Sequence, residues 1–249
     1  MSRETCSRCD RPKSVCLCRY LPSEKVSLPF SVAIFQTPGE EKCAKSTVKI
    51  LRNCIECSVW KRRSLANAGG HTGKLFNGPE TLILYPGDQA VPVDKLEEET
   101  KKRICCVVLF DGTWESCRRM YLANISFLAE AHHVRLRPTS PSKYIVRQQP
   151  NLESLSTLEA LVELIVQLGV DGAEEKAQLL LRPFHAMVQM QLRHMTTATH
   201  RPNRPGYDPH LLSRAASLPP LEEGSPVSPV GKTSCEPFQN EREIFPEEE

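Results

Sequence analysis

Four cysteine thiols near the beginning of the chain are spaced as metal ligands. They occur as Cys6-x2-Cys9-x6-Cys16-x-Cys18, within thirteen residues. Two closely spaced pairs of thiolates can reach one tetrahedral ion, and zinc favours sulfur ligands. Because all four ligands would be protein sulfurs, no coordination position remains for a substrate. The spacing predicts a structural zinc site in a hairpin over residues 1–25; the alternative is a redox-active or disulfide-bonded hairpin.

An acid and an indole follow an apolar run in the middle of the chain. Residues 104–110 carry no charge and are rich in β-branched side chains, which is typical of a strand buried on both faces. Asp111, Thr113 and Trp114 come next, where a helical pattern begins. Ligands of open α/β sheets bind beyond the carboxyl ends of the strands, so we predict Asp111 and Trp114 as catalytic residues. The alternatives are that Asp111 or Thr113 only caps the helix and that Trp114 only packs.

The rest of the sequence predicts the elements that would position these side chains. Strands are expected at residues 28–36, 58–60, 81–85, 104–110 and 133–136, and helices at 44–53, 94–103, 114–123, 156–168 and 173–194. This alternation predicts an α/β fold with a largely parallel sheet. Pro183 should break or kink the last helix. Residues 196–249 are rich in Pro, Ser, Arg and Glu, and we expect a disordered tail there.

Charge and hydropathy limit the classes of partner. The 249 residues carry a net charge of +2, so RNA contacts would have to come from local clusters. Three such clusters are Lys61-Arg62-Arg63, Arg118-Arg119 and the pair Arg135 and Arg137. No secretory signal and no membrane-spanning run is expected, which predicts a soluble intracellular protein without membrane contact. The eleven cysteines are then thiols or metal ligands.

Several short motifs occur together in one order along the chain. They are the four-cysteine hairpin, Pro38-x-Glu40, Leu84-Tyr85-Pro86-Gly87, Asp111-Gly112-Thr113-Trp114, Ser142-Lys-Tyr144-Ile-Val-Arg147 and Ser156-Thr157-Leu-Glu159-Ala160. Together they resemble the DTW-domain family of tRNA-uridine aminocarboxypropyltransferases, and within it the eukaryotic DTW domain-containing protein 2 group. The resemblance covers roughly residues 6–195.

The resemblance implies a fold and an activity. The fold would be SPOUT-like, an α/β domain over residues 26–195 whose chain forms a knot. The activity would transfer the 3-amino-3-carboxypropyl group of S-adenosyl-L-methionine (SAM) to N3 of a uridine in tRNA, leaving methylthioadenosine. Such a protein is expected in the cytoplasm, the nucleus or both. Its oligomeric state does not follow from the sequence.

The resemblance also suggests roles for particular residues. Asp111 would be the base that takes the uridine proton or the counter-charge of the SAM amino group, and Trp114 would stack on a base. Arg147 would bind the SAM carboxylate or a tRNA phosphate, unless it only forms a surface ion pair. The implied cofactor-binding residues are Leu84, Tyr85, Pro86, Gly87, Thr113, Tyr144, Arg147, Thr157 and Glu159.

One segment departs from the family pattern. Many relatives have His where this chain has Thr37, and basic and Asn residues are replaced around Cys43 and Ser46, so residues 41–75 match poorly. Two other functions therefore stay open. One is a SPOUT-type RNA methyltransferase that uses the same SAM, and the other is a zinc-containing RNA-binding protein without activity.

Overall fold

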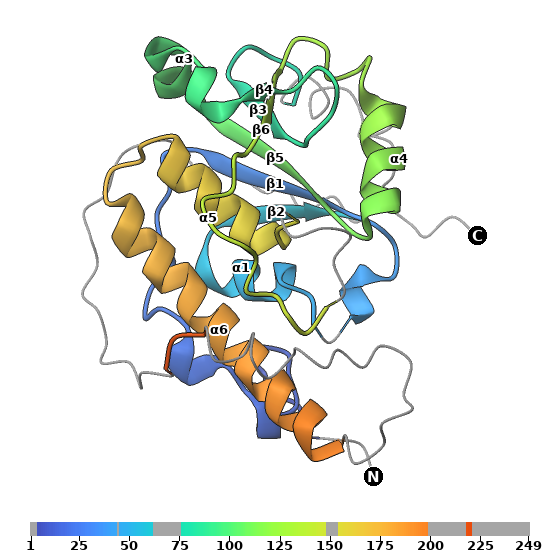
Figure 1. Ribbon diagram of the computed structural model, residues 1–249, viewed down its shortest axis with the longest axis vertical. Helices are drawn as coiled ribbons and strands as arrows, with labels where there is room; N and C mark the ends of the chain where they lie inside the picture. The colour runs from blue at the N-terminus through green and yellow to red at the C-terminus, as the bar shows by residue number, and fades with distance from the viewer. Residues whose placement is uncertain (1–3, 44, 62–75, 148–153, 199–217, 221–249) are drawn as a thin grey trace.

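The computed structural model describes residues 4–43, 45–61, 76–147, 154–198 and 218–220. Figure 1 shows strands and helices that alternate along most of this part of the chain. The strands are β1 (Ser31–Gln36), β2 (Cys57–Trp60), β3 (Thr81–Leu84), β4 (Val91–Pro92), β5 (Cys106–Asp111) and β6 (His132–Arg135). The helices are α1 (Val48–Cys54), α3 (Glu98–Arg103), α4 (Trp114–Asn124), α5 (Thr157–Gln167) and α6 (Ala173–Ala198), with 3-10 turns at Lys13–Val15, Cys18–Tyr20, Glu40–Lys42 and Val93–Lys95.

The six strands form one sheet in the order β2-β1-β5-β3-β6-β4, and every neighbouring pair is parallel. The predicted α/β class and parallel sheet are confirmed, and all six residues of β5 are buried, as expected for a central strand. Strand β4 was not predicted, because two residues give no alternation to detect. The helix predicted at 94–103 is instead a 3-10 turn followed by α3.

Helix α6 corrects a prediction about its proline. The helix runs from Ala173 to Ala198 with Pro183 inside it, so the proline does not break it. Its packing explains why, since Phe184, Met187 and Val188, just beyond the proline, are fully buried. Tertiary burial outweighs the lost backbone hydrogen bond, which costs about 3 kcal/mol in an isolated helix.

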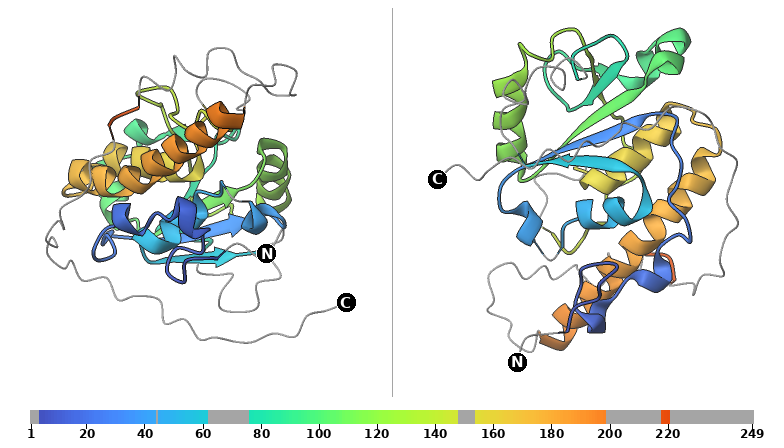
Figure 2. Two further views of the ribbon diagram at one scale, coloured as in Figure 1. Left: turned by 90° about the horizontal axis from the view of Figure 1, so that it is seen from below. Right: turned by 180° about the vertical axis from the view of Figure 1, so that it is seen from behind.

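The two faces of the sheet carry different layers (Figure 2). Alternate residues of β5 divide between them: Val107 and Leu109 belong to a core shared with α1, α5 and α6, whereas Val108 and Phe110 pack with residues of α4. This follows from the two-residue repeat of a strand. Both faces are apolar, which is why the buried strands show no polar alternation in the sequence.

Aromatic side chains form a continuous layer on the α4 face. Phe35 of β1 lies 6.3 Å from Phe110, Phe110 lies 6.0 Å from Tyr85, and Tyr85 stacks on Tyr121 at 4.3 Å between ring centroids. The Tyr121 hydroxyl is 2.9 Å from Nδ1 of His133, whose Nε2 faces the Leu128 carbonyl at 2.9 Å. Because a carbonyl only accepts, Nε2 carries the proton and the tyrosine donates to Nδ1. The layer fixes Tyr85 at the end of β3.

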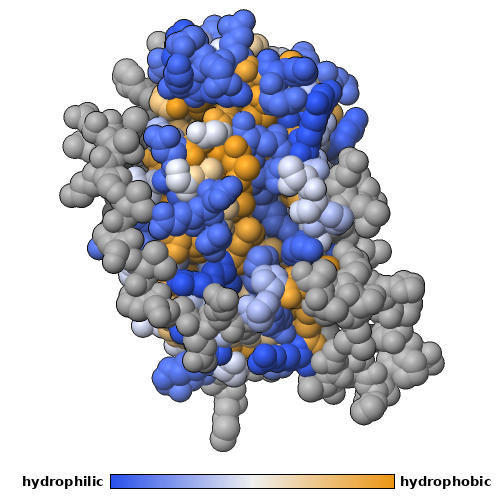
Figure 3. Space-filling model, turned by 60° about the vertical axis from the view of Figure 1, so that its left-hand side comes forward, coloured by the Kyte–Doolittle hydropathy of each residue, from blue (hydrophilic) through white to orange (hydrophobic). Residues whose placement is uncertain are grey.

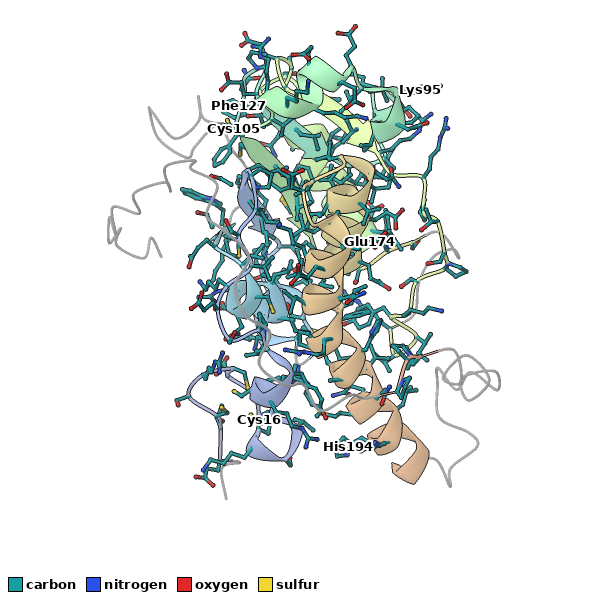
Figure 4. All side chains as sticks on the ribbon, turned by 90° about the vertical axis from the view of Figure 1, so that its left-hand side faces the viewer. Cys16, Lys95, Cys105, Phe127, Glu174 and His194 are labelled. Carbon is teal, nitrogen blue, oxygen red and sulfur yellow. The ribbon has the colours of Figure 1, made fainter. Side chains whose placement is uncertain are left out.

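The N-terminal hairpin packs on the main domain through its own apolar residues. Leu17, Tyr20 and Leu21 are buried in the same core as α6. Arg182 of α6 donates to the carbonyls of Tyr20 at 2.9 Å and Leu21 at 3.1 Å. Figure 4 shows Cys16 at the same end of the molecule as His194 of α6, far from Lys95 and Phe127.

The knot and the disordered tail are two further predictions from the sequence. The implied knot is not established by the strand order and stays a prediction. The tail predicted at 196–249 falls mostly outside the described residues, although α6 continues to Ala198.

Among the described helices, none is long and apolar enough to span a membrane. On the face in Figure 3, apolar residues are exposed over the middle of the molecule, with polar residues around and among them.

Glu159 ties the segment before α5 to the helix itself. Its carboxylate accepts from the Ser142 hydroxyl at 2.8 Å, the Lys143 backbone N–H at 2.7 Å and the Ser156 N–H at 2.9 Å. The Ser156 hydroxyl in turn accepts from the N–H of Glu159, which completes a capping box. The predicted start of this helix is confirmed, and the carboxylate also fixes the segment that leads to Tyr144 and Arg147.

Replacing Glu159 by Ala should lower the free energy of unfolding by about 3 kcal/mol, because three donors lose their acceptor in a buried place. Urea denaturation measures the change. Glu163→Ala on the same helix is the control, since that carboxylate is more exposed and its loss should cost less than about 1 kcal/mol. Equal losses in the two variants would contradict this account of Glu159.

Candidate active site

A cavity of about 380 Å³ lies at the carboxyl ends of the central strands. It is bounded by the ends of β3 and β5, the first turn of α4, the segment after β6 and the first turn of α5. Its wall includes Leu84, Tyr85, Pro86, Asp111, Thr113, Trp114, Arg135, Tyr144, Arg147, Ser154 and Thr157. A volume of this size suits a small-molecule ligand, and the position is the one that parallel sheets use for binding.

Asp111 is the last residue of β5 and its carboxylate is held from two sides. Gln36 ends the neighbouring strand β1 in register with Asp111, and its side-chain amide donates to Oδ2 at 2.9 Å. Thr157 opens α5 and its hydroxyl donates to Oδ1 at 2.6 Å. Asp111 is 5% exposed. The geometry therefore fixes an acid on the wall of the cavity with one donor on each oxygen.

Burial raises the pKa of the Asp111 carboxyl above its usual value, while the hydrogen bonds from Gln36 and Thr157 oppose that rise. The negative charge of Glu40 adds to the rise, and the positive charge of Arg147 opposes it. A carboxylate with a raised pKa is a stronger base than an exposed one. Such perturbed groups are typical of functional sites.

The turn after β5 shows which residue caps α4. The side chain of Thr113 accepts from the backbone N–H of Ser116, so Thr113 is the cap and Asp111 is not. Gly112 is required at this turn because a Cβ there would lie 2.6 Å from Oγ1 of Thr37. Trp114 is 42% exposed, so a large part of its indole is open to solvent rather than packed in the core.

A second acid faces the predicted arginine. Arg147 pairs with Glu40, with Nη2 at 2.6 Å from Oε1 and Nη1 at 3.4 Å from Oε2. The pair is mostly buried, so it is not the surface ion pair considered from the sequence. Tyr144 is buried beside it and donates to the Lys45 carbonyl. Burial raises the pKa of Tyr144, so its hydroxyl stays protonated near neutral pH.

Most of the predicted site residues meet at this cavity. Leu84, Tyr85, Pro86, Thr113, Tyr144, Arg147 and Thr157 line it together with Asp111 and Trp114. Gly87 and Glu159 are not part of its wall. Gly87 lies against the Tyr121 ring, where a Cβ would come within 2.6 Å of a ring carbon. The roles of all these residues toward a ligand stay predictions.

The sequence analysis missed other residues of this region. Gln36 and Thr47 were not singled out, because their contribution depends on the strand order and on the fold of the segment after β1. Glu40 was noted in a motif but given no partner. Ser46, in the divergent segment, has a buried hydroxyl without a hydrogen-bond partner among the described residues. The same segment nevertheless forms α1 and β2 in the core, and residues 62–75 lie outside the described part.

The four cysteines of the hairpin converge as expected. Their sulfur atoms all lie within 4.8 Å of one another, with Cys6 and Cys18 at 3.5 Å and Cys9 and Cys16 at 3.6 Å. Backbone hydrogen bonds from Cys9 and Arg8 lower the pKa of the Cys6 thiol to about 6. This cluster could hold a metal ion through four sulfurs.

The hairpin is less basic on its surface than its sequence indicates. Arg11 is 4% exposed and donates to the Val15 carbonyl, so it is not part of the hairpin's charged surface. Lys13 pairs with Glu4, and Arg19 lies over the Tyr20 ring, 4.8 Å from its centre. These three cations are therefore engaged within the hairpin.

The fold and the cavity define an α/β protein with a ligand site at the carboxyl edge of a parallel sheet. Residues 3–192 match the DTW domain family, and the chain belongs to that family. The relationship predicted from the ordered motifs is thereby confirmed.

Named relatives support the assignment of the chain to this family. The chain is 32% identical to tRNA-uridine aminocarboxypropyltransferase 2 of Drosophila melanogaster over 195 residues, 76% of each chain. It is 31% identical to the protein of that name from Macaca fascicularis, over 77% of this chain and 65% of the relative. It is 24% identical to tRNA-uridine aminocarboxypropyltransferase A of Arabidopsis thaliana, over 89% of this chain and 91% of the relative. No solved structure matches.

Proposed function

We propose that the protein transfers the 3-amino-3-carboxypropyl group of SAM to N3 of a uridine in tRNA. The observation that carries the proposal is the buried Asp111 on the wall of a cavity, hydrogen-bonded by Gln36 and Thr157. Relatives named tRNA-uridine aminocarboxypropyltransferase support transfer of this group to a uridine of tRNA. We also propose that it acts in the cytoplasm, the nucleus or both.

The proposed chemistry needs a base. Uridine N3 carries a weakly acidic proton and is a poor nucleophile until it is lost, and a positioned general base contributes about 10²–10⁴-fold. Asp111 takes this proton, N3 then forms a bond to the γ-carbon of the aminocarboxypropyl arm, and the bond from that carbon to sulfur breaks. SAM supplies a sulfonium leaving group, and methylthioadenosine departs neutral. The direction of the arm decides which carbon reacts.

The other residues of the cavity position the reactants. Thr157 donates to Asp111, so we assign it to holding the base rather than to binding SAM. Arg147 lines the cavity with a planar guanidinium that can bind a carboxylate, and Glu40 holds it in place. Leu84, Tyr85 and Pro86 form one wall of the cavity and suit contact with the nucleoside part of SAM.

The direct test is mass spectrometry of tRNA nucleosides after incubation with the purified protein and SAM. We expect aminocarboxypropyl-uridine and methylthioadenosine in equal amounts. S-adenosylhomocysteine with a methylated base would identify a methyltransferase instead. Binding of tRNA without any product would identify an RNA-binding protein without activity.

Replacing Asp111 by Asn should lower single-turnover transfer by about 10²-fold or more, because Asn keeps the shape but cannot take a proton. SAM binding, measured by calorimetry, should change little. Asp94→Asn, which alters a surface partner of Arg137, is the control and should transfer at the normal rate. A loss confined to SAM affinity would instead make Asp111 the counter-charge of the amino group.

Replacing Thr157 by Val should shift the acidic limb of the kcat/KM profile to higher pH. The Thr157 hydrogen bond lowers the pKa of Asp111, so its removal raises that pKa. The base works when ionised, and ionisation then requires a higher pH. Thr139→Val makes the same change at an exposed hydroxyl and should leave the limb in place. An unshifted limb in Thr157→Val would show that Asp111 does not limit the rate as a base.

We further propose that the four-cysteine cluster binds zinc. A tetrahedral zinc with Zn–S bonds of about 2.3 Å has sulfurs roughly 3.8 Å apart, close to the separations in this hairpin. The donor set is entirely sulfur, which suits zinc in a structural site. When bound, the ion would hold the hairpin against α6, where Arg182 contacts Tyr20 and Leu21.

Elemental analysis of the purified protein should find about one zinc per chain. Cys16→Ser should lose the metal and increase hydrogen exchange in the hairpin and the adjoining part of α6, because both share one core. Cys105→Ser, at an exposed cysteine outside the cluster, should keep the metal. A metal-free protein with an equally protected hairpin would contradict the zinc site.

A further inference from the structure

Helix α4 presents an exposed stripe that starts at the cavity. Trp114, Arg118 and Leu122 are spaced four residues apart and therefore lie on one side of the helix. Trp114 is 42% exposed, Leu122 is 46% exposed and Arg118 is exposed as well. The opposite side of α4 packs on the aromatic layer of the sheet. Of the four large hydrophobic side chains that are exposed among the described residues, two, Trp114 and Leu122, lie on this one side of α4 with Arg118 between them.

Arg118 differs from the other cations of the basic clusters. The described members of those clusters are each engaged within the chain: Lys61 with Glu41 at 2.6 Å, Arg119 with Glu115 at 3.6 Å, Arg137 with Asp94 at 3.0 Å, and Arg135 with the Ala90 carbonyl at 2.8 Å. Within the described residues, Arg118 makes no hydrogen bond and no ion pair. Its guanidinium is therefore available to an external anion.

The stripe is continuous with the cavity. Trp114 is part of the cavity wall. Burial raises the pKa of Tyr85, another residue of that wall, and the positive charge of Arg118 acts in the opposite direction. Arg118 therefore lies close enough to act on the cavity's edge. A polymer that delivers one unit into the cavity would pass Trp114 and then Arg118.

We propose that Trp114, Arg118 and Leu122 form the docking surface for the RNA strand beside the target uridine. The inference rests on the proposed function and adds where the RNA binds. Trp114 stacks on a base next to the uridine, Arg118 binds a backbone phosphate, and Leu122 extends the apolar contact. Aromatic rings and arginine planes are the groups that bind unstacked nucleotides, and an unpaired cation matches the phosphate charge.

The salt dependence of tRNA binding tests the two contacts separately, by fluorescence anisotropy on the full chain. Arg118→Ala should lower the slope of log affinity against log salt by about one and weaken binding roughly tenfold at low salt. Trp114→Ala should weaken binding by roughly 5- to 100-fold without changing the slope, because stacking releases no counterions.

Arg103→Ala is the matched control. Arg103 is an exposed arginine at the end of α3, before β5 begins and so at the opposite edge of the sheet from the cavity. The variant makes the same change of net charge and should bind tRNA like the wild-type protein. Melting temperatures of all three variants should be unchanged, because each side chain is exposed.

Two results overturn the proposal: an Arg118→Ala variant with the slope and affinity of Arg103→Ala, or a Trp114→Ala variant that binds normally. These outcomes can be distinguished from a failure of the proposed function. If the wild-type protein forms aminocarboxypropyl-uridine while Arg118→Ala binds tRNA normally, the proposed activity is supported and the docking surface is refuted. If tRNA binding depends on Arg118 but the wild-type protein forms no product, the docking surface is supported and the proposed activity is refuted.

Discussion

The hydrogen bonds that Asp111 accepts from Gln36 and Thr157 join the three parts on which the site depends. Gln36 belongs to β1, Asp111 to β5 and Thr157 to α5, so one carboxylate connects two strands and a helix. The register of β1 and β5 places Gln36 beside Asp111, and the capping box of α5 fixes the turn from which Thr157 donates. The acid is therefore positioned by backbone geometry on both sides.

The segments around this carboxylate are held by polar groups rather than by packing alone. Glu159 gathers Ser142, the Lys143 N–H and Ser156, and this holds the segment that carries Tyr144 and Arg147. Arg147 in turn pairs with Glu40, which follows β1. Two chain segments about a hundred residues apart thus meet at the cavity through one ion pair. Arg147 lines the cavity and Glu40 does not. Removing Glu40 would leave the Arg147 charge uncompensated in a mostly buried place, so a change outside the cavity wall would alter the cavity.

The sequence predicted the fold class, five of the six strands found in the described residues and most of the cavity, because buried parallel strands and their polar ends leave a strong local pattern. It did not predict the partners of those polar ends. Gln36 ends an apolar run as Asp111 does, but only the strand order shows that the two are neighbours. The burial of Arg11 could not be predicted either, because it depends on how the hairpin folds back on itself. Pro183 was expected to break or kink α6; the helix is not broken there, and the residues just beyond the proline, Phe184 and Met187, are fully buried.

The position of Asp111 has a cost for stability that its hydrogen bonds only partly offset. Burial and the nearby Glu40 disfavour its charged form, whereas Gln36, Thr157 and Arg147 favour it. An apolar residue at the end of β5 would avoid this conflict and would also fill the cavity wall. In the proposed reaction this conflict would have a use, because a carboxylate that is fully stabilised as an anion is a weak base, and one that is never ionised cannot accept a proton. A balance of two donors against burial would then be the usual exchange of stability for activity at functional sites.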